Sequence, residues 1–218
     1  MQQKASVIFS TAYLPPVEFF SYASVSEKIV IEACENFHKQ TYRNRCYIYS
    51  ANGKLPLCIA LEHSRRSGLP IKDVKISYAL PWNKMHWRAI TSAYNKSAYF
   101  LYYGDDFEKF FSGSYKWLIE LNHDIISVCL KLLKLNKEIV YTEIFQKKYI
   151  DNTLDLRNGI NPKNKSSIDF PAYNQVFDTK FGFIGNLSII DLLFNCGPES
   201  LEYIKKTTSG IQSSGDAY

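Results

Sequence analysis

The sequence predicts an α+β protein in which an N-terminal, mainly antiparallel sheet is followed by a helical C-terminal half. Two observations lead to this fold class. Short apolar runs of alternating polarity fill the chain before Pro81, and helical spacing replaces them after it. The chain has 218 residues, 46% of them hydrophobic, which is enough to fold around its own core. We therefore expect one domain over residues 1–206 and a flexible Ser/Gly-rich tail over 207–218.

Four segments are expected to build the sheet. Residues 6–14 are typical of a buried opening strand, and residues 28–33 of a second one. A β-hairpin is predicted at 46–61, because its centre carries Asn-Gly, the dipeptide most typical of a two-residue hairpin turn. Residues 73–78 alternate between apolar and polar side chains, so we expect a further strand there.

The C-terminal half is predicted to be mostly helical. Apolar residues at helical spacing indicate a helix over 87–101 and a longer one from 115 to 135. Residues 138–142 are expected to return to the sheet as a strand. A last short helix is predicted after Asn186, which would serve as its N-cap, and Gly197 would end it.

The polar segment 151–172 lies between these elements. A stretch this long without regular structure is a lid, a binding loop or a disordered region, and the sequence leaves these alternatives open. It carries Arg157. Asp191 lies within the last, otherwise apolar helix, where a buried carboxylate needs a partner. That partner is either a structural group such as Arg157 or a ligand.

Composition and motifs exclude several classes of protein. The net charge of +5 permits a phosphate-bearing partner without requiring one. Five scattered cysteines, no signal peptide and no long apolar run favour a reduced, cytoplasmic protein without a membrane span. The phosphate-binding, dinucleotide-binding and nucleophile-elbow motifs are all absent. The four histidines are widely spaced, so we expect no metal ion and no cofactor.

The stretch "FHKQTYRNRCYIY", residues 37–49, is the most unusual part of the chain. It contains Lys39, Arg43 and Arg45 with no acid among them, together with Gln40 and Asn44. Arginine binds phosphate or carboxylate with two hydrogen bonds, and the amides suit a sugar or a base edge. If this segment is a strand, Arg43 and Arg45 share one face. The alternative is a solvated edge strand protected by its charges.

Two other motifs have both a functional and a structural interpretation. His86 lies between two tryptophans at the start of a predicted helix, so it is either a general base or a packed core histidine. Tyr13 and Glu18 flank a Pro-Pro pair, which either presents them at a cleft or forms a turn. Cys46 follows Arg45, but its place in a strand favours a buried, inert thiol.

In their order along the chain, six segments resemble the WbqC-like protein family. The resemblance covers nearly the whole chain, and no single motif is diagnostic. The segments are "YLPPVEFF" (13–20), "HKQTYRNRCYI" (38–48), "NGKLPLCIAL" (52–61), "WNKMHWRAITSAYNKSAYF" (82–100), "LIELNHDII" (118–126) and "NLSIIDLLFNCGP" (186–198).

The resemblance implies a role in bacterial surface-polysaccharide and O-antigen biosynthesis, where some members are named glycine transferases. The implied reaction is transfer of a glycyl or other aminoacyl group to the amine of a nucleotide-linked amino sugar. A thioester or a charged tRNA would be the donor, because the chain has no ATP-binding motif. The alternative is a non-catalytic module that binds a glycan precursor or nucleic acid.

This reaction assigns expected roles to the candidate residues. The base would be His86, or else Glu18 or Glu35, and Asn44 or Arg45 would stabilise the oxyanion. The remaining candidates are expected to bind substrate. They are Lys39, Arg43 and Arg157 for the diphosphate, Trp87, Tyr94 and Tyr99 for stacking, and Tyr13, Gln40 and Asp191 as further polar contacts.

Overall fold

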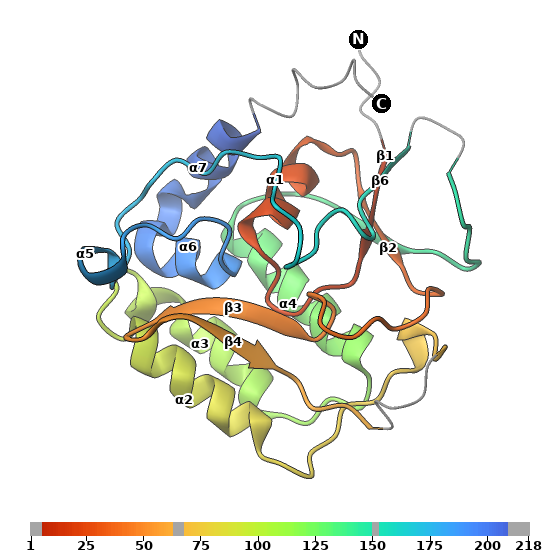
Figure 1. Cartoon of the computed structure of the whole chain (residues 1–218), viewed down its shortest axis with the longest axis horizontal. Helices are drawn as coiled ribbons and strands as arrows, with labels where there is room; N and C mark the ends of the chain where they lie inside the picture. Colours follow the sequence, from red (N-terminus) through yellow and green to blue (C-terminus); the bar gives the residue numbers. More distant parts are fainter. Residues whose placement is uncertain (1–5, 63–67, 150–152, 209–218) are drawn as a thin grey trace.

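The computed structural model describes residues 6–62, 68–149 and 153–208, and its main sheet is parallel (Figure 1). Four strands run in the order β5-β2-β1-β6, and each neighbouring pair is parallel. The expected mixture of helices and strands is confirmed, but the antiparallel arrangement is wrong for this sheet. Its strands are β1 (Ser6–Ser10), β2 (Ile29–Glu32), β5 (Ile139–Tyr141) and β6 (Thr153–Asp155).

An unpredicted helix explains the parallel pairing. Helix α1 (Val17–Val25) connects β1 to β2 and returns the chain to the same end of the sheet, as parallel strands require. Every residue from Val17 to Ala23 is buried, so the helix has no solvent-facing polar side over this stretch and shows no 3.6-residue period. The sequence therefore gives no sign of a crossover between the first two strands. The strand expected at 138–142 is confirmed as β5, whereas β6 adds a strand that the sequence analysis did not predict in the C-terminal half.

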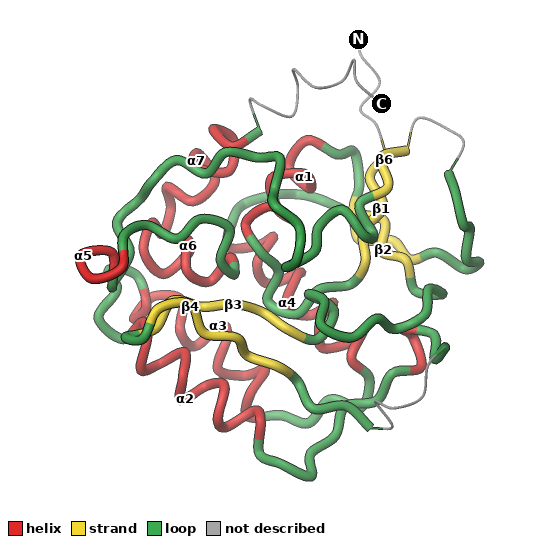
Figure 2. The backbone as a smooth tube through the Cα atoms, in the orientation of Figure 1, coloured by secondary structure: helices red, strands yellow, loops and turns green. Residues whose placement is uncertain are grey.

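The predicted hairpin is confirmed as a separate two-stranded sheet, distinct from the parallel one in Figure 2. It consists of β3 (Arg45–Ser50) and β4 (Gly53–Cys58), with Ser50 opposite Gly53. The strand expected at 73–78 is wrong. Its start is a 3-10 helix, η1 (Ile71–Asp73), and Lys75 and Ile76 make only isolated bridges.

Three helices lie after the hairpin: α2 (Trp82–Tyr94), α3 (Phe100–Ser112) and α4 (Leu118–Leu132). The long helix predicted over 115–135 is confirmed by α4. The helix predicted over 87–101 is two helices, because the chain turns between Tyr94 and Phe100 while the apolar spacing continues. The C-terminal elements are α5 (Asp178–Phe181), α6 (Ile189–Cys196), η2 (Gly197–Glu199) and α7 (Ser200–Thr207).

Aromatic packing around α6 joins these helices into the core. Phe194 is fully buried, and its ring centroid lies 5.4 Å from that of Tyr94, 5.1 Å from Phe100 and 5.6 Å from Phe107. Such edge and tilted contacts add to the burial of apolar area. Figure 1 shows α6 between the hairpin and α7, so this cluster links the two halves of the molecule.

The structure describes residues 153–172 of the polar segment and the first two residues of the expected tail. Residues 153–172 include β6, and their side chains Leu156, Arg157 and Ile168 are buried, so this part is packed against the molecule. Thr207 and Thr208 are buried, and residues 209–218 of the expected tail lie outside the described residues. Within the described residues, every helix is too short or too polar to span a lipid bilayer.

The boundaries of α6 confirm one prediction and correct another. Gly197 ends the helix with φ at 52°, as expected for a C-terminal glycine. Asn186 is not the N-cap, because Ser188 occupies that position. The side chain of Asn186 instead donates a hydrogen bond to Glu18.

We expect Gly197→Ala to lower the free energy of unfolding by about 2–5 kcal/mol. A Cβ here would lie 2.5 Å from the ring of Tyr99, and the positive φ adds conformational strain. Gly182→Ala is the matched control, because its φ is 73° but a Cβ would meet nothing within 4 Å. The control should lose only about 1–2 kcal/mol in urea unfolding. Equal losses for the two variants would contradict the packing of Tyr99 on Gly197.

Candidate functional site

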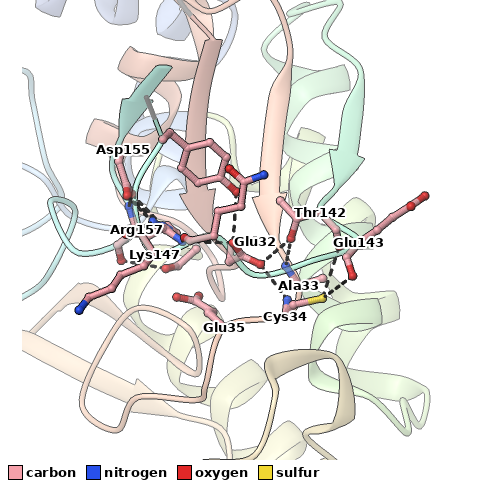
Figure 3. A network of polar contacts seen from close by, with 12 residues as sticks. Glu32, Ala33, Cys34, Glu35, Thr142, Glu143, Lys147, Asp155 and Arg157 are labelled. Atoms are coloured by element: carbon pink, nitrogen blue, oxygen red, sulfur yellow. Dashed lines mark hydrogen bonds and ion pairs between the residues drawn. The ribbon is translucent and has the colours of Figure 1, made fainter. Parts of the chain in front are cut away.

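The carboxyl edge of the parallel sheet carries a buried network of charges (Figure 3). Ligands in parallel α/β sheets usually bind at this edge, so its contents are informative. Glu32 ends β2 and Asp155 ends β6, and the Arg157 guanidinium lies between them. Its Nε and Nη2 donate to Asp155 at 2.9 and 2.5 Å, and its Nη1 donates to Glu32 at 3.2 Å.

Arg157 also holds the connection that leads from β5 towards β6. Its Nη1 donates to the carbonyl oxygen of Gln146 at 2.7 Å, and its Nη2 to that of Lys147 at 3.3 Å. The guanidinium carbon lies 5.2 Å from the ring centroid of Phe145 and 5.1 Å from that of Tyr149. Burial tends to raise the pKa of Asp155, but the hydrogen bonds from Arg157 outweigh it and lower the pKa overall. Both oxygens of Asp155 are therefore committed to Arg157.

A second buried ion pair lies beside the first. Arg43 is 2% exposed and binds Glu35 with two hydrogen bonds, Nε to Oε1 at 2.9 Å and Nη2 to Oε2 at 2.6 Å. The Ser10 hydroxyl accepts from Arg43 Nη2 at 2.6 Å and donates to the Arg157 carbonyl oxygen at 2.8 Å. Both pairs thus meet at the end of β1. The chain's own side chains fill the place where a parallel sheet would usually hold a ligand.

The expectation that Arg43 and Arg45 share a strand face is wrong. Strand β3 begins at Arg45, and Arg43 lies in the preceding loop, where its side chain turns inward to Glu35. Of the arginines in the stretch 37–49, only Arg45 faces the adjoining groove.

A groove of about 290 Å³ lies next to this network, between the loop that follows β2 and the end of β4. One wall comes from the loop, which the Arg43–Glu35 pair anchors, and the other comes from the segment that leaves β4. The residues that line the groove are Phe37, Lys39, Gln40, Asn44, Arg45, Cys58, Ile59, Ala60 and Leu61. Four of them were candidates from the sequence: Lys39, Gln40, Asn44 and Arg45.

Arg45 is the best-positioned polar group of the groove. Its Nε donates to the thiol sulfur of Cys58 at 2.9 Å, and its Nη1 lies 3.4 Å from the Tyr47 hydroxyl. Nη2 has no protein partner among the described residues, so it is available to a ligand. Asn44 donates through Nδ2 to the Ile59 carbonyl oxygen at 3.0 Å, which leaves its Oδ1 as an acceptor.

His86 is enclosed beneath the groove rather than in it. The side chain is 6% exposed and lies on α2, with Nδ1 2.9 Å from the Tyr13 hydroxyl. The backbone of Cys58 also hydrogen-bonds the ring, and the Trp82 ring packs against it. Burial lowers the pKa of His86 to about 4, despite the Cys58 bond. Its position therefore matches the packed core histidine, and Tyr13 is fully buried with it.

The two glutamates proposed as alternative bases are also enclosed. Glu35 is held by Arg43 as described. Glu18 is buried on α1, where its carboxylate accepts hydrogen bonds from Ser166 at 2.6 Å and Asn186 at 2.9 Å. Burial raises the pKa of Glu18, although these two hydrogen bonds oppose the shift. Neither carboxylate lines the groove.

Asp191 is partnered inside the protein, and the partner is not Arg157. It is fully buried and accepts hydrogen bonds from the Tyr94 hydroxyl at 2.8 Å, the Tyr173 hydroxyl at 2.6 Å and Gln175 Nε2 at 2.7 Å. Burial raises its pKa, and the three donors partly offset that effect. Tyr94 and Asp191 therefore join α2 to α6 as a structural cluster.

Trp87 and Tyr99 also lie away from the groove. The Trp87 ring stacks on Phe100 and Phe111 with centroids 6.0 and 5.5 Å apart, and its Nε1 donates to Glu108. Tyr99 packs on Gly197. The structure thus brings together four of the sequence candidates in the groove and two arginines with Glu35 at the sheet edge.

The sequence-based choice of residues missed Glu32, Asp155 and Cys58. Each acid ends a strand of the parallel sheet, a pattern recognisable only once those strands are known to be parallel. Cys58 is exposed at the end of β4, whereas the neighbouring-strand Cys46 is fully buried and burial raises the pKa of its thiol. Among the described residues, no group of three or more His, Cys, Asp or Glu is arranged to hold a metal ion.

We expect Arg157→Met to lower the free energy of unfolding by about 3–5 kcal/mol, because it leaves two carboxylates at the sheet edge without their cation. Lys205→Met is the control, since its ion pair with Glu202 at 2.7 Å is solvent-exposed on both sides. That variant should change stability by less than about 1 kcal/mol. Denaturant unfolding measures both, and a small loss for Arg157→Met would show that the network is dispensable.

The low pKa of His86 predicts a pH dependence of stability. The unfolded chain binds a proton near the ordinary histidine pKa of about 6.5, and the folded chain only near 4, so stability falls as the pH drops between these values. The contribution lost by pH 4 is about 3 kcal/mol. His86→Gln removes it, so the stability of the wild type minus that of the variant should decrease on acidification. A difference that is constant from pH 7 to 4 would contradict the buried neutral ring.

Comparison with known proteins places the chain in a family. An uncharacterised protein of Mycobacterium tuberculosis, Rv1507c, is 22% identical over 230 residues, which cover 93% of this chain and 98% of that protein. No solved structure matches the chain. The family model of the WbqC-like proteins matches residues 11–156 and 143–203, and these ranges contain the groove, the charged sheet edge and α6. The chain therefore belongs to the WbqC-like protein family.

Proposed function

We propose that the protein transfers a glycyl or other aminoacyl group to the amine of a nucleotide-linked amino sugar in bacterial surface-polysaccharide synthesis. The observation that carries the proposal is the groove beside the sheet edge, which combines two cations with two amides. Membership of the WbqC-like family supports the same substrate class. The proposal places the activity in the cytoplasm, where sugar nucleotides and activated acyl groups are available.

The groove has the chemistry that a sugar nucleotide requires. Lys39 and Arg45 supply two positive charges for a diphosphate, and Arg45 offers its free Nη2 as a directional donor. Gln40 and the Oδ1 of Asn44 suit sugar hydroxyls. A volume of about 290 Å³ is at the small end for ligand sites, so the groove would hold the diphosphate and the sugar rather than the whole molecule.

The reaction needs no buried base. An amine with a pKa near 8 is partly neutral at pH 7–8, so a fraction of the bound substrate can attack without help from a protein base. The amine nitrogen attacks the acyl carbonyl, a new amide bond forms, and the bond to the thiolate or the tRNA hydroxyl breaks. The proton lost by the amine goes to the leaving group or to water.

A second function uses the same groove without catalysis. His86, Glu18 and Glu35 are all enclosed, and none lines the groove, which favours a module that only binds a glycan precursor. The two functions share the ligand and differ in turnover.

Mass spectrometry of a transfer reaction tests the proposal directly. The protein is incubated with a panel of nucleotide-linked amino sugars and with glycine supplied free, as a thioester and on tRNA. We expect one sugar nucleotide to gain the mass of a glycyl group with an activated donor and not with free glycine. Sugar-nucleotide binding without any product across the panel would instead establish the binding module.

Arg45→Gln should weaken sugar-nucleotide binding about 10- to 100-fold, because it removes a charge-assisted hydrogen bond. Arg88→Gln is the control, since Arg88 is exposed on α2 and does not line the groove. Equilibrium dialysis or calorimetry compares the two variants with the wild type. Unchanged affinity in Arg45→Gln would rule out the groove as the ligand site.

A further inference from the structure

Trp117 lies between two lysines on the surface next to the groove. The Nζ of Lys75 is 5.3 Å from its ring centroid and the Nζ of Lys116 is 4.9 Å away. The Trp117 ring is partly exposed, unlike Trp82, which is buried. A partly exposed aromatic ring with two lysine ammonium groups over it has the composition of a nucleobase platform.

This platform is continuous with the wall of the groove. Ala60 and Leu61 line the groove, and the Ser77 amide donates to the Ala60 carbonyl oxygen at 2.9 Å. Residues 75–77 therefore pair with the groove-lining segment on one side. On their other side they pair with the residues that precede α4: Lys75 forms a bridge with Trp117, and the Ile76 amide donates to the Lys116 carbonyl oxygen at 3.0 Å. Neighbouring strands lie about 4.8 Å apart, so Trp117 stands about 10 Å from the groove wall.

The alternation of side chains places the platform on the outer surface. Ile76 and Leu118 are buried, whereas their chain neighbours Lys75 and Trp117 are partly exposed, as expected for extended segments with one face on the core. The backbone of Trp117 is therefore held by pairing with the segment 75–76, and both lysine ammonium groups lie over its ring.

We propose that this platform, defined as Lys75, Lys116 and Trp117, binds the unpaired end of an RNA that carries the acyl group to the groove. The inference rests on the proposed function and names its donor as a charged RNA rather than a thioester. One base would stack on Trp117, and the two lysines would bind the phosphates on either side of it. The acylated end would then reach Arg45 across the segment 60–62.

Charge and size favour RNA over the sugar nucleotide as the occupant. Lys39 and Arg45 already match the two charges of a diphosphate, so Lys75 and Lys116 provide for additional phosphates. A base that stacks on Trp117 displaces the two lysine ammonium groups from the ring. The lysines then bind the phosphates on either side of that base. Stacking and phosphate pairing together are stronger than the exposed cation–π contacts they replace.

Nearby acids limit the length of RNA that the surface can hold. Two exposed acids lie close by in the sequence: Glu62 follows the groove-lining residue Leu61, and Asp73 lies two residues before Lys75. Their charge opposes a long nucleic acid, so we expect contact with a few unpaired nucleotides and little affinity for a duplex. A short single-stranded end fits this surface best.

The test uses fluorescence anisotropy with a labelled single-stranded oligoribonucleotide that ends in CCA, over a range of salt concentrations. We expect Trp117→Ala to weaken binding about 10-fold or more, and Trp117→Phe to retain most of it. The double variant Lys75→Gln, Lys116→Gln should reduce the slope of log affinity against log salt by about 1.4. Lys84→Gln, an exposed lysine on α2, is the control and should change neither quantity.

Three results would overturn the inference: no binding of the oligoribonucleotide by the wild type, binding that is indifferent to Trp117, or equal binding of poly-glutamate, which has charge but no bases. Circular dichroism and the retained affinity of Trp117→Phe guard against misfolding of the alanine variant. Transfer is measured separately from two donors, a glycyl-tRNA and a glycyl thioester, because the thioester needs the groove and no RNA. Transfer from the thioester without RNA binding would end only this inference, whereas RNA binding without transfer from either donor would end the transferase and, with it, the role of the RNA as donor.

Discussion

The arrangement of the molecule depends on buried arginines at the carboxyl edge of the parallel sheet. Arg157 neutralises Glu32 and Asp155, which end two strands, and Arg43 neutralises Glu35 in the loop that follows one of them. Leaving Glu32, Glu35 or either arginine unpaired inside the protein would cost several kcal/mol, on the order of a third of a typical domain's stability. The loop that follows β2 and the connection 142–149 are fixed by the same contacts, so strand ends, loop and connection are one unit.

This network also decides where a ligand can bind. A parallel sheet usually offers the crevice beyond its strand ends, at the point where successive connections leave in opposite directions. Here the side chains of Arg43 and Ser10 occupy that crevice, where Arg43 donates to the Ser10 hydroxyl and Ser10 donates to the Arg157 carbonyl oxygen. The open groove lies beside this crevice, between the loop that follows β2 and the end of β4. Three of its polar residues, Lys39, Gln40 and Asn44, are consequently carried by the anchored loop, and Arg45 lies at the start of β3.

The remaining buried polar residues serve the fold. Asp191, Glu18 and His86 are each satisfied by neutral donors or acceptors and have shifted pKa values because of burial. In a protein of this family such residues are attractive candidates for catalysis, yet all three lie beneath the surface. A reaction in the groove would therefore rely on positioning, on cations and on an activated donor, because the described residues that line the groove include no carboxylate and no histidine.

The sequence by itself determined the local elements and the residues that gather around the groove. The Asn-Gly turn fixed the hairpin, helical spacing fixed α4, and Gly197 ended α6, because turn, period and cap are properties of neighbouring residues. Only the tertiary structure decided that the main sheet is parallel, since α1 is buried on all sides and carries no helical period. Only the tertiary structure also showed that Arg43 turns inward, away from Arg45, and that His86 is buried rather than at the surface. The direction of a side chain depends on partners such as Glu35 and Tyr13, which lie far away in the sequence or on another element.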